Sequence, residues 1–229
     1  MDRVGVVIAG GGMGTRMKGR VPKQFLLLNR RPIITATVAL MESLAFIHEI
    51  VLVVPSQFVR KVESLVRRGR FRKVSGVISG GSSRQESVWN GLHAFEQRPD
   101  IVLVHDAVRP LVSQRVVRKV LEEASGHGGA VVGTRVKDTI KVEGEPGFYA
   151  ETLDRSKLWV VQTPQGFSFD LLLKAHEAAR ASGFCGTDEA SLVERMGVAV
   201  KIVEGDWRNI KITTREDLEL AKLLCRRTA

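Results

Sequence analysis

A run of glycines follows the first apolar segment of the chain, residues 4–9, and two cations come after it. Glycine lets backbone N–H groups approach a phosphate closely. Arg16 and Lys23 stand within fourteen residues of the first glycine, and such side chains hold phosphate oxygens. The segment predicts a phosphate loop, with a tight structural turn as the alternative. The glycines are Gly10, Gly11, Gly12 and Gly14.

The spacing of these glycines excludes the two most familiar phosphate loops. A dinucleotide-binding fingerprint would need a third glycine where Met17 stands. A Walker loop would need lysine directly after Gly19, where Arg20 stands instead. We therefore expect a phosphate loop of another type, in which Pro22 fixes the backbone just before the lysine.

An aspartate and an arginine follow another apolar run, residues 101–104. An aspartate at the end of a buried strand is well placed to hold Mg²⁺, although Asp106 could instead cap a turn. We expect His105 to be structural. Arg109 could bind a phosphate or simply pair with Asp106.

A third polar segment combines glycines, hydroxyls and a helix start. Gly81, Ser82 and Ser87 could hold a base or a ribose through backbone and hydroxyl groups. The alternative is an ordinary loop before a helix that is capped by Ser83 and Glu86 in the pattern S-x-x-E.

Short polar segments also stand at element boundaries late in the chain, and Lys211 in the last of them could reach a second phosphate. No Ser-His-Asp order, HExxH motif or metal-ligand spacing argues for hydrolysis. The segments are residues 163–165, 186–189 and 209–213.

Apolar runs and helical spacings alternate along the chain, which predicts one α/β domain over residues 1–229 with a mostly parallel sheet flanked by helices. Ligands of such sheets bind beyond the carboxyl ends of the strands, where the glycines and Asp106 lie. The expected strands are residues 4–9, 50–54, 101–104, 129–132 and 198–203. Helices are expected to begin at Pro32, Ser83, Ser113, Ser168 and Thr213, the last in the pattern Thr213-x-x-Glu216.

One segment departs from this alternation. Residues 135–160 alternate polar and apolar side chains around the turn sequence 144–147. This pattern predicts a β-hairpin or arm that projects from the α/β body. Because such arms often pair with another subunit, we expect a homodimer.

The formal net charge of +10 could reflect an anionic substrate, nucleic acid or nothing specific. Its densest basic run, residues 60–73, has the spacing of a helix with a solvated basic face. No pattern of nucleic-acid-binding modules is present, and no apolar run approaches the ~18 residues of a membrane span. Cys185 and Cys225 read as free thiols. We therefore expect a cytoplasmic enzyme with neither nucleic acid nor membrane as a partner.

Together these segments resemble the 2-C-methyl-D-erythritol 4-phosphate cytidylyltransferases of the non-mevalonate isoprenoid pathway, over about residues 4–224. The glycine loop with Gly-Thr-Arg is shared with sugar-nucleotide pyrophosphorylases and is not specific. The specific combination is Val21-Pro22-Lys23-Gln24-Phe25, His105-Asp106-Ala107, Arg109-Pro110, Thr163-Pro164-Gln165, Thr187-Asp188-Glu189 and Asn209-Ile210-Lys211.

The resemblance implies a Rossmann-like fold of the nucleotide-diphospho-sugar transferase type and a Mg²⁺-dependent reaction. CTP and 2-C-methyl-D-erythritol 4-phosphate would give 4-CDP-2-C-methyl-D-erythritol and pyrophosphate. Implied catalytic residues are Arg16, Lys23 and Lys211. Implied nucleotide-binding residues are Gly10, Gly11, Gly12, Gly14, Gly81, Ser82, Ser87, Asp106 and Ala107, with Asp106 also on the Mg²⁺ side. Implied polyol-phosphate residues are Arg109, Thr139, Arg155, Thr163, Thr187 and Lys211.

The resemblance further implies that Thr139 and Arg155 lie on an arm that reaches a neighbouring subunit. Two departures stand out: Gly10-Gly11 replaces the Ala-Ala of many members, and Ser82 replaces the Asp of some. A ribitol-5-phosphate cytidylyltransferase would share this scaffold and is the alternative. A sugar-1-phosphate nucleotidyltransferase fits the late segments less well.

Overall fold

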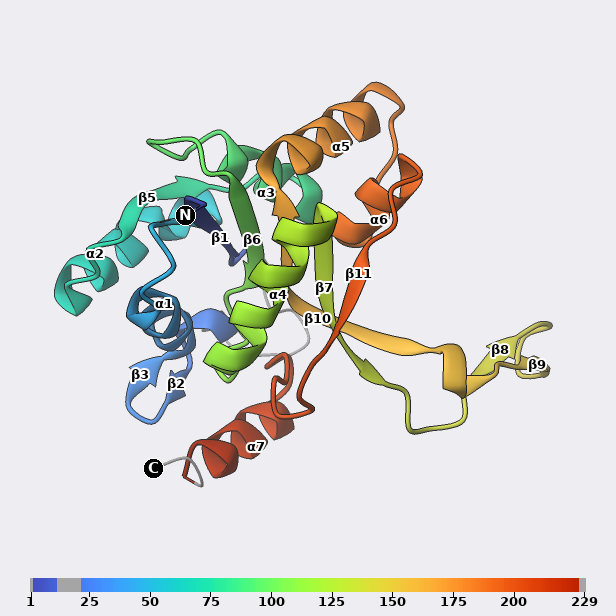
Figure 1. Cartoon of the computed structure of the whole chain (residues 1–229). Coiled ribbons are helices and arrows are strands. Elements are labelled where there is room, and N and C mark those ends of the chain that lie inside the picture. Colours follow the sequence, from blue (N-terminus) through green and yellow to red (C-terminus); the bar gives the residue numbers. More distant parts are fainter. Residues whose placement is uncertain (1, 12–21, 227–229) are drawn as a thin grey trace.

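A mixed sheet forms the centre of the molecule. The computed structural model describes residues 2–11 and 22–226. Within them, seven strands pair in the order β11-β7-β10-β6-β1-β4-β5 (Figure 1). The strands are β1 (Val4–Ala9), β4 (Glu49–Val54), β5 (Val74–Ser79), β6 (Ile101–Asp106), β7 (Gly129–Arg135), β10 (Trp159–Ser168) and β11 (Lys201–Glu204). Every pairing is parallel except those that β10 makes with β6 and β7.

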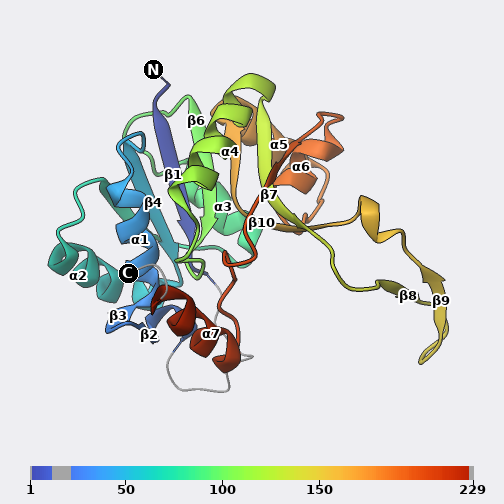
Figure 2. The same cartoon turned by 60° about the horizontal axis from the view of Figure 1, so that its bottom comes forward.

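Helices cover both faces of this sheet (Figures 1 and 2). The described helices are α1 (Ile33–Ser43), α2 (Val59–Gly69), α3 (Arg84–Leu92), α4 (Gln114–His127), α5 (Phe169–Ala181), α6 (Glu189–Arg195) and α7 (Arg215–Arg226). Short 3₁₀ turns are η2 (Lys23–Phe25), η3 (Ser56–Phe58) and η4 (Arg155–Lys157). Outside the main sheet, β2 (Leu27–Leu28) pairs with β3 (Arg31–Pro32), and β8 (Lys141–Glu143) with β9 (Tyr149–Thr152).

The continuous apolar runs of the sequence are explained by burial on both sides of the sheet. Side chains alternate between the faces of a strand. Ile8, Leu52 and Leu103 accordingly pack in the core that α1, α2 and α4 cover. Their neighbours Val53 and Val104 belong to the core under α3, α5 and α6. The expected mostly parallel sheet with helices on both faces is confirmed.

Three elements were not expected from the sequence. The edge strand β5 has a mixed composition and only partly buried residues, so its apolar signal is weak. The strand β10 runs from the base of the arm back into the sheet, and only its first two residues fall within the segment expected as an arm. Residues 163–165, which were expected at an element boundary, lie inside this strand. The helix α6 has seven residues and begins at the N-cap Asp188. The last expected strand, residues 198–203, is instead Lys201–Glu204.

The helix starts agree with the sequence in position, although two caps differ in detail. Ser83 accepts a hydrogen bond from Glu86 N, but the Glu86 carboxylate accepts from Ser82 and not from the cap residue. At the last helix the cap lies one residue later than expected. Thr214 Oγ1 accepts from Asp217 N, and the Asp217 carboxylate accepts from Thr213 N and Thr214 N.

The expected arm is present. The strands β8 and β9 form an exposed antiparallel hairpin that projects from the α/β body (Figures 1 and 2). Phe148 and Tyr149 at its tip are 70% and 77% exposed. In the described part of the chain, none of the helices combines the length and the apolar character needed to cross a bilayer.

Phe167 offers a test of the core under α3, α5 and α6. It lies on β10 between β6 and β7 and is fully buried in that core. Phe167→Ala should lower the free energy of unfolding by about 3–5 kcal/mol, since it leaves a cavity that the packed strands cannot close. Urea denaturation measures this. The control Leu223→Ala, at an exposed position of α7, should change stability by less than about 0.5 kcal/mol. Equal losses for the two variants would contradict the assigned core.

Candidate active site

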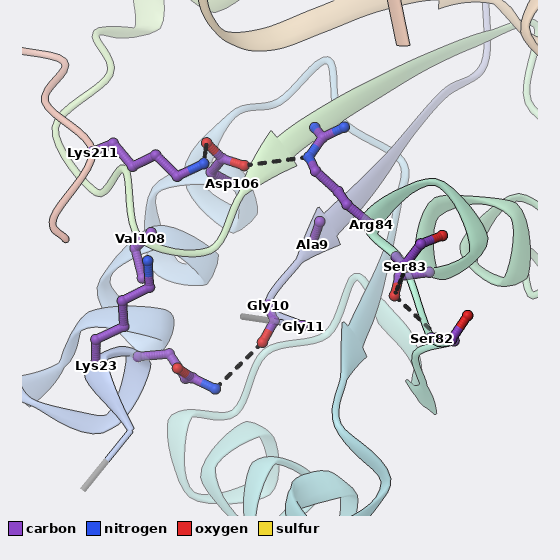
Figure 3. Close-up of a pocket in the computed structure, with 13 residues that line it drawn as sticks. Ala9, Gly10, Gly11, Lys23, Ser82, Ser83, Arg84, Asp106, Val108 and Lys211 are labelled. Carbon is purple, nitrogen blue, oxygen red and sulfur yellow. Dashed lines mark hydrogen bonds and ion pairs between the residues drawn. The ribbon is translucent and has the colours of Figure 1, made fainter. Parts of the chain in front are cut away.

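A pocket opens at the carboxyl ends of β1, β5 and β6, where parallel sheets bind ligands. We call it the glycine pocket, and its cavity volume is about 270 Å³. Lys23 lies on the side of this pocket opposite Ser82 and Ser83 (Figure 3). The lining residues are Ala9, Gly10, Gly11, Lys23, Gln24, Gly81, Ser82, Ser83, Arg84, Ser87, Asp106, Val108 and Lys211.

A second pocket adjoins the first. We call it the threonine pocket, and its volume is about 240 Å³. It shares Arg84, Asp106 and Lys211 with the glycine pocket. The two spaces therefore meet at these charged side chains. The lining residues are Arg84, Asp106, Arg109, Val161, Gln162, Thr163, Gln165, Thr187, Asp188 and Lys211.

Asp106 is the centre of the junction. Its Oδ2 lies 3.0 Å from Lys211 Nζ and 3.1 Å from Arg109 Nε, and its Oδ1 lies 3.9 Å from Arg84 Nε. Arg84 and Lys211 approach it from opposite sides (Figure 3). Burial pushes the pKa of Asp106 upward, but the three cations outweigh burial and hold the pKa at about 2. Asp106 and the buried Glu189 offset two of these three charges, and Asp188 lines the threonine pocket as well. Lys23 adds a fourth cation in the glycine pocket, so the two pockets together keep a small positive excess that suits anionic ligands.

A buried hydrogen-bond relay fixes the backbone of this aspartate. Asp106 N donates to Thr163 Oγ1 at 3.0 Å, and the Thr163 hydroxyl lies 3.0 Å from His105 Nδ1. His105 Nε2 lies 3.0 Å from the Arg109 carbonyl, which can only accept. Nε2 therefore carries a proton. Burial lowers the pKa of His105 to about 4, which keeps the imidazole neutral near pH 7. The expected structural role of His105 is confirmed.

Asn209 joins the late segments to the junction. Its side-chain Nδ2 donates to the backbone carbonyl of Thr163 and to Gln162 Oε1. The backbone carbonyl of Asn209 accepts from Arg109 Nη1 at 2.7 Å. Asn209 is almost fully buried. Because Lys211 is two residues later, this network sets the direction from which the lysine reaches Asp106.

The turn before α3 presents its backbone to the glycine pocket through internal hydrogen bonds. The Ser87 hydroxyl accepts from Gly81 N and donates to the carbonyl of Ser83. The Ser82 hydroxyl and N–H both donate to Glu86 at 2.7 Å. A Cβ atom at position 81 would lie 2.2 Å from the Glu86 side chain, so a larger residue there would displace Glu86 from its bonds to Ser82. Ser82 and Ser87 thus line the pocket but use their hydroxyls within the turn.

Arg84 is the functional candidate that the sequence analysis missed. Its Nη1 donates to Glu189 Oε1 at 2.7 Å, and Glu189 is fully buried at the start of α6. Burial tends to lower the pKa of Arg84, but Glu189 and Asp106 outweigh it and raise the pKa. The sequence signal for Arg84 is a cation that follows a glycine turn at the end of a strand. Because β5 was not expected, the turn could not be placed at the carboxyl edge of the sheet.

The expected residues fall into three groups. Asp106, Lys23, Gly10, Gly11, Gly81, Ser82 and Ser87 line the glycine pocket, and Arg109, Thr163, Thr187 and Lys211 meet at the threonine pocket. Gly12, Gly14 and Arg16 lie outside the described residues. Thr139 and Arg155 are exposed on the arm and line neither pocket.

Two expected contacts need correction. Ala107 does not reach the glycine pocket, because it is fully buried, its N–H donates to Ala9 and its carbonyl accepts from Thr37. Gly10 does line the pocket, but its N–H already donates to Val53 at 2.7 Å. Gly10 therefore contributes space and not a phosphate donor. A methyl group there would lie 3.2–3.3 Å from its neighbours, so the space is close to its limit.

The junction fits a magnesium ion that a nucleotide brings with it. Asp106 Oδ1 faces the shared space with only the distant contact to Arg84. Among the described residues, no group of three or more Asp, Glu, His or Cys side chains could form a metal cage. Mg²⁺ commonly binds through one or two carboxylates together with substrate phosphates and water, so a lone aspartate is sufficient.

The fold and the charged double pocket are those of an α/β nucleotidyltransferase. The family model of the 2-C-methyl-D-erythritol 4-phosphate cytidylyltransferases matches residues 4–227. The chain belongs to this family.

Relatives and solved structures agree. The chain is 44% identical over 223 residues to the 2-C-methyl-D-erythritol 4-phosphate cytidylyltransferase of Geotalea uraniireducens, covering 96% of this chain and 95% of the relative. It is 45% identical over 218 residues to that of Geobacillus kaustophilus, with 95% of each covered. The crystal structure of the Thermus thermophilus enzyme superposes with a TM-score of 0.79 at 33% identity, covering 99% and 100% of the two chains.

The neutral state of His105 predicts a pH dependence of stability. Its folded pKa of about 4 lies below the ordinary value of 6.5, so the unfolded chain binds more protons between these values. The stability is complete above about pH 6.5 and is lost as the pH falls toward 4, by about 1–2 kcal/mol from pH 7 to 5. Urea denaturation at both pH values should show a smaller loss for His105→Gln. An unchanged loss would contradict the assignment.

Proposed function

We propose that this chain transfers the CMP group of CTP to the phosphate of 2-C-methyl-D-erythritol 4-phosphate and releases pyrophosphate. The relatives carry this activity in their names, and 2-C-methyl-D-erythritol 4-phosphate is favoured over the alternative ribitol 5-phosphate. The observation that carries the proposal is the junction of two cationic pockets at Arg84, Asp106 and Lys211. A reaction between two polyanions needs such a meeting point.

CTP occupies the glycine pocket in this proposal. The turn at Gly81 offers backbone groups to the base, as nucleotide sites commonly do. Lys23 is 8% exposed and sits on η2 beside Gly10, where it reaches the phosphates. Arg16 and the glycines at 12 and 14 complete the phosphate loop in the proposal, although they lie outside the described residues.

The polyol phosphate occupies the threonine pocket. Arg109 and Lys211 supply positive charge there, and the Thr187 hydroxyl stands at the rim. The Thr163 hydroxyl is committed to Asp106 N and His105, so its contribution is to hold the aspartate in position. Arg155 and Thr139 of a second copy would close this pocket from outside.

The chemistry then needs no general base. The substrate phosphate has a second pKa near ~6 and is mostly a dianion at neutral pH. Its oxygen forms a bond to the α-phosphorus of CTP as the bond from that phosphorus to the bridging oxygen breaks, and both electrons leave with pyrophosphate. The protein must align the groups, offset their repulsion and stabilise charge on the transferring phosphoryl group. Lys23, Arg84 and Lys211 are placed for this.

Mg²⁺ fits beside Asp106 and, when bound, would neutralise the triphosphate and polarise the transferring group. Asp106 would hold it through Oδ1, while Arg109 and Lys211 retain Oδ2. Because its pKa is about 2, the aspartate remains ionised and ready for a cation throughout the neutral range.

A homodimer is part of the proposal. The arm leaves the body (Figure 2), and Thr139 and Arg155 line neither pocket of their own chain. Large apolar side chains remain exposed on the arm and at its base: Ile140, Val142, Phe148, Tyr149, Val160 and Val161. Burial of these against a second copy would stabilise the pair. Neither Cys185 nor Cys225 forms a disulfide, which suits the proposed cytoplasmic location.

The direct test is an assay of pyrophosphate release from CTP. Release with 2-C-methyl-D-erythritol 4-phosphate, dependent on Mg²⁺, supports the proposal. Release with ribitol 5-phosphate at a higher kcat/KM would contradict the assigned substrate.

Lys23→Ala should lower kcat by roughly 10²–10³, because it removes one cation that stabilises the transferring phosphoryl group. Steady-state kinetics on folded protein measures this loss. Arg98→Ala removes an exposed cation outside both pockets and should leave kcat unchanged. Near-normal turnover of Lys23→Ala would remove the lysine from this role.

Arg155→Ala should raise the KM for the polyol phosphate and leave the KM for CTP nearly unchanged. If the arm acts in the partner's site, mixing Arg155→Ala with Lys23→Ala subunits should restore about a quarter of wild-type activity, because half of the dimers are mixed and each has one intact site. Activity no greater than the sum of the two parents would rule out this sharing.

A further inference from the structure

A further pocket lies on the reverse side of the turn that lines the glycine pocket, between α3 and α5. We call it the rear pocket; its volume is about 230 Å³. Drug-sized ligands commonly fill about 300–1,000 Å³, so this space suits a ligand of one or two rings. The features used below are Ser83, Glu86, Trp89, His176, Arg180 and Phe184.

His176 is the most unusual of these residues. It lies on α5, its side chain is fully buried, and neither ring nitrogen has a hydrogen-bonding partner. Burial lowers its pKa to about 4, so the ring is neutral and offers one donor and one acceptor. An unpaired buried polar group is destabilising. His176 stands in the wall of the rear pocket with its nitrogens closed to solvent, so a ligand there can pair with it once a neighbouring side chain moves.

The remaining lining is aromatic and charged. Trp89 and Phe184 provide ring surfaces, and the Arg180 guanidinium lies 4.8 Å from the Trp89 ring centre. The Glu86 carboxylate adds acceptors at the rim. Flat apolar surfaces beside mixed donors and acceptors suit a planar ring whose edge carries both kinds of group, and nucleobases belong to that class.

The rear pocket is connected with the glycine pocket. Ser83, the N-cap of α3, lines both. Glu86 lines the rear pocket, and its carboxylate accepts two hydrogen bonds of 2.7 Å from Ser82 of the glycine pocket, one from the Ser82 N–H and one from the Ser82 hydroxyl. A ligand that donates a hydrogen bond to the Glu86 carboxylate therefore competes with Ser82 for that acceptor. Loss of the bonds from Ser82 loosens the turn around Gly81.

We propose that the rear pocket binds a small planar heteroaromatic ligand of the nucleobase type, and that this binding weakens the binding of CTP. The ligand ring takes the place of the Arg180 guanidinium beside Trp89, its edge then meets His176, and its contact with Glu86 weakens the hydrogen bonds from Ser82 to Glu86. The coupling, unlike the binding, rests on the proposed CTP site.

Cys185 at the rim of the rear pocket permits a direct binding test. In a Cys225→Ser background it is the single cysteine of the chain. Adenosine without CTP should slow the reaction of Cys185 with a thiol-labelling reagent, because Cys185 lines the rear pocket and not the glycine pocket. No protection up to the solubility of adenosine and guanosine would overturn the proposal.

The variant His176→Phe, made in the same background, separates a ligand site from a structural position. It keeps a planar ring and removes both unpaired nitrogens, so stability in urea should be equal or higher. Protection of Cys185 should be lost. The matched control Lys174→Gln, exposed on the same helix and outside the pocket, should keep it. Equal protection in wild type and His176→Phe would overturn the proposal.

The coupling is tested by the affinity of CTP measured with and without adenosine. A several-fold higher Kd for CTP is expected, together with an equal weakening of adenosine binding by CTP, because coupling is reciprocal. Protection of Cys185 with an unchanged Kd for CTP would overturn the link through Glu86. Failure of CTP to bind at all, with Cys185 still protected, would instead contradict the proposed function.

Discussion

The charge of one buried carboxylate organises this molecule. Asp106 ends the central strand β6, and a buried aspartate is stable there only because Arg84, Arg109 and Lys211 surround it. Those three cations come from three distant parts of the chain. Hydrogen bonds to Glu189 and to the backbone carbonyl of Asn209 hold Arg84 and Arg109, respectively, beside Asp106. With Lys23, the cations of the two pockets outnumber Asp106, Asp188 and Glu189 by one, which leaves a small positive excess for anionic substrates.

The elements with strong local sequence signals could be predicted from the sequence alone. The runs at β1, β4, β6 and β7 are continuous and aliphatic because both of their faces are covered. Caps such as Ser113 and Ser168 mark helix starts by hydrogen bonds to the third residue after them. The placement of Asp106 and the glycines at one edge of the sheet followed from the rule for parallel strands.

Other features depend on contacts between distant residues, which no local pattern reveals. The antiparallel strand β10 alternates like its neighbouring arm, and only its pairing with β6 and β7 distinguishes it. Ser87 is a pocket residue by position, but its hydroxyl is consumed by Gly81 and Ser83. The importance of Arg84 depends on Glu189, more than one hundred residues later. The Thr163–His105 relay likewise spans strands that are distant in sequence.

The last helix, α7, packs against the segment that carries Lys211. Ile212, fully buried beside Lys211, packs with Leu218 and Ala221 of α7 in a small separate core, and its N–H donates to the carbonyl of Val108. Loss of that helix would keep every polar residue of the pockets in the chain but remove the apolar contacts of Ile212, the neighbour of Lys211. The direction of this lysine therefore depends on apolar packing outside the pockets.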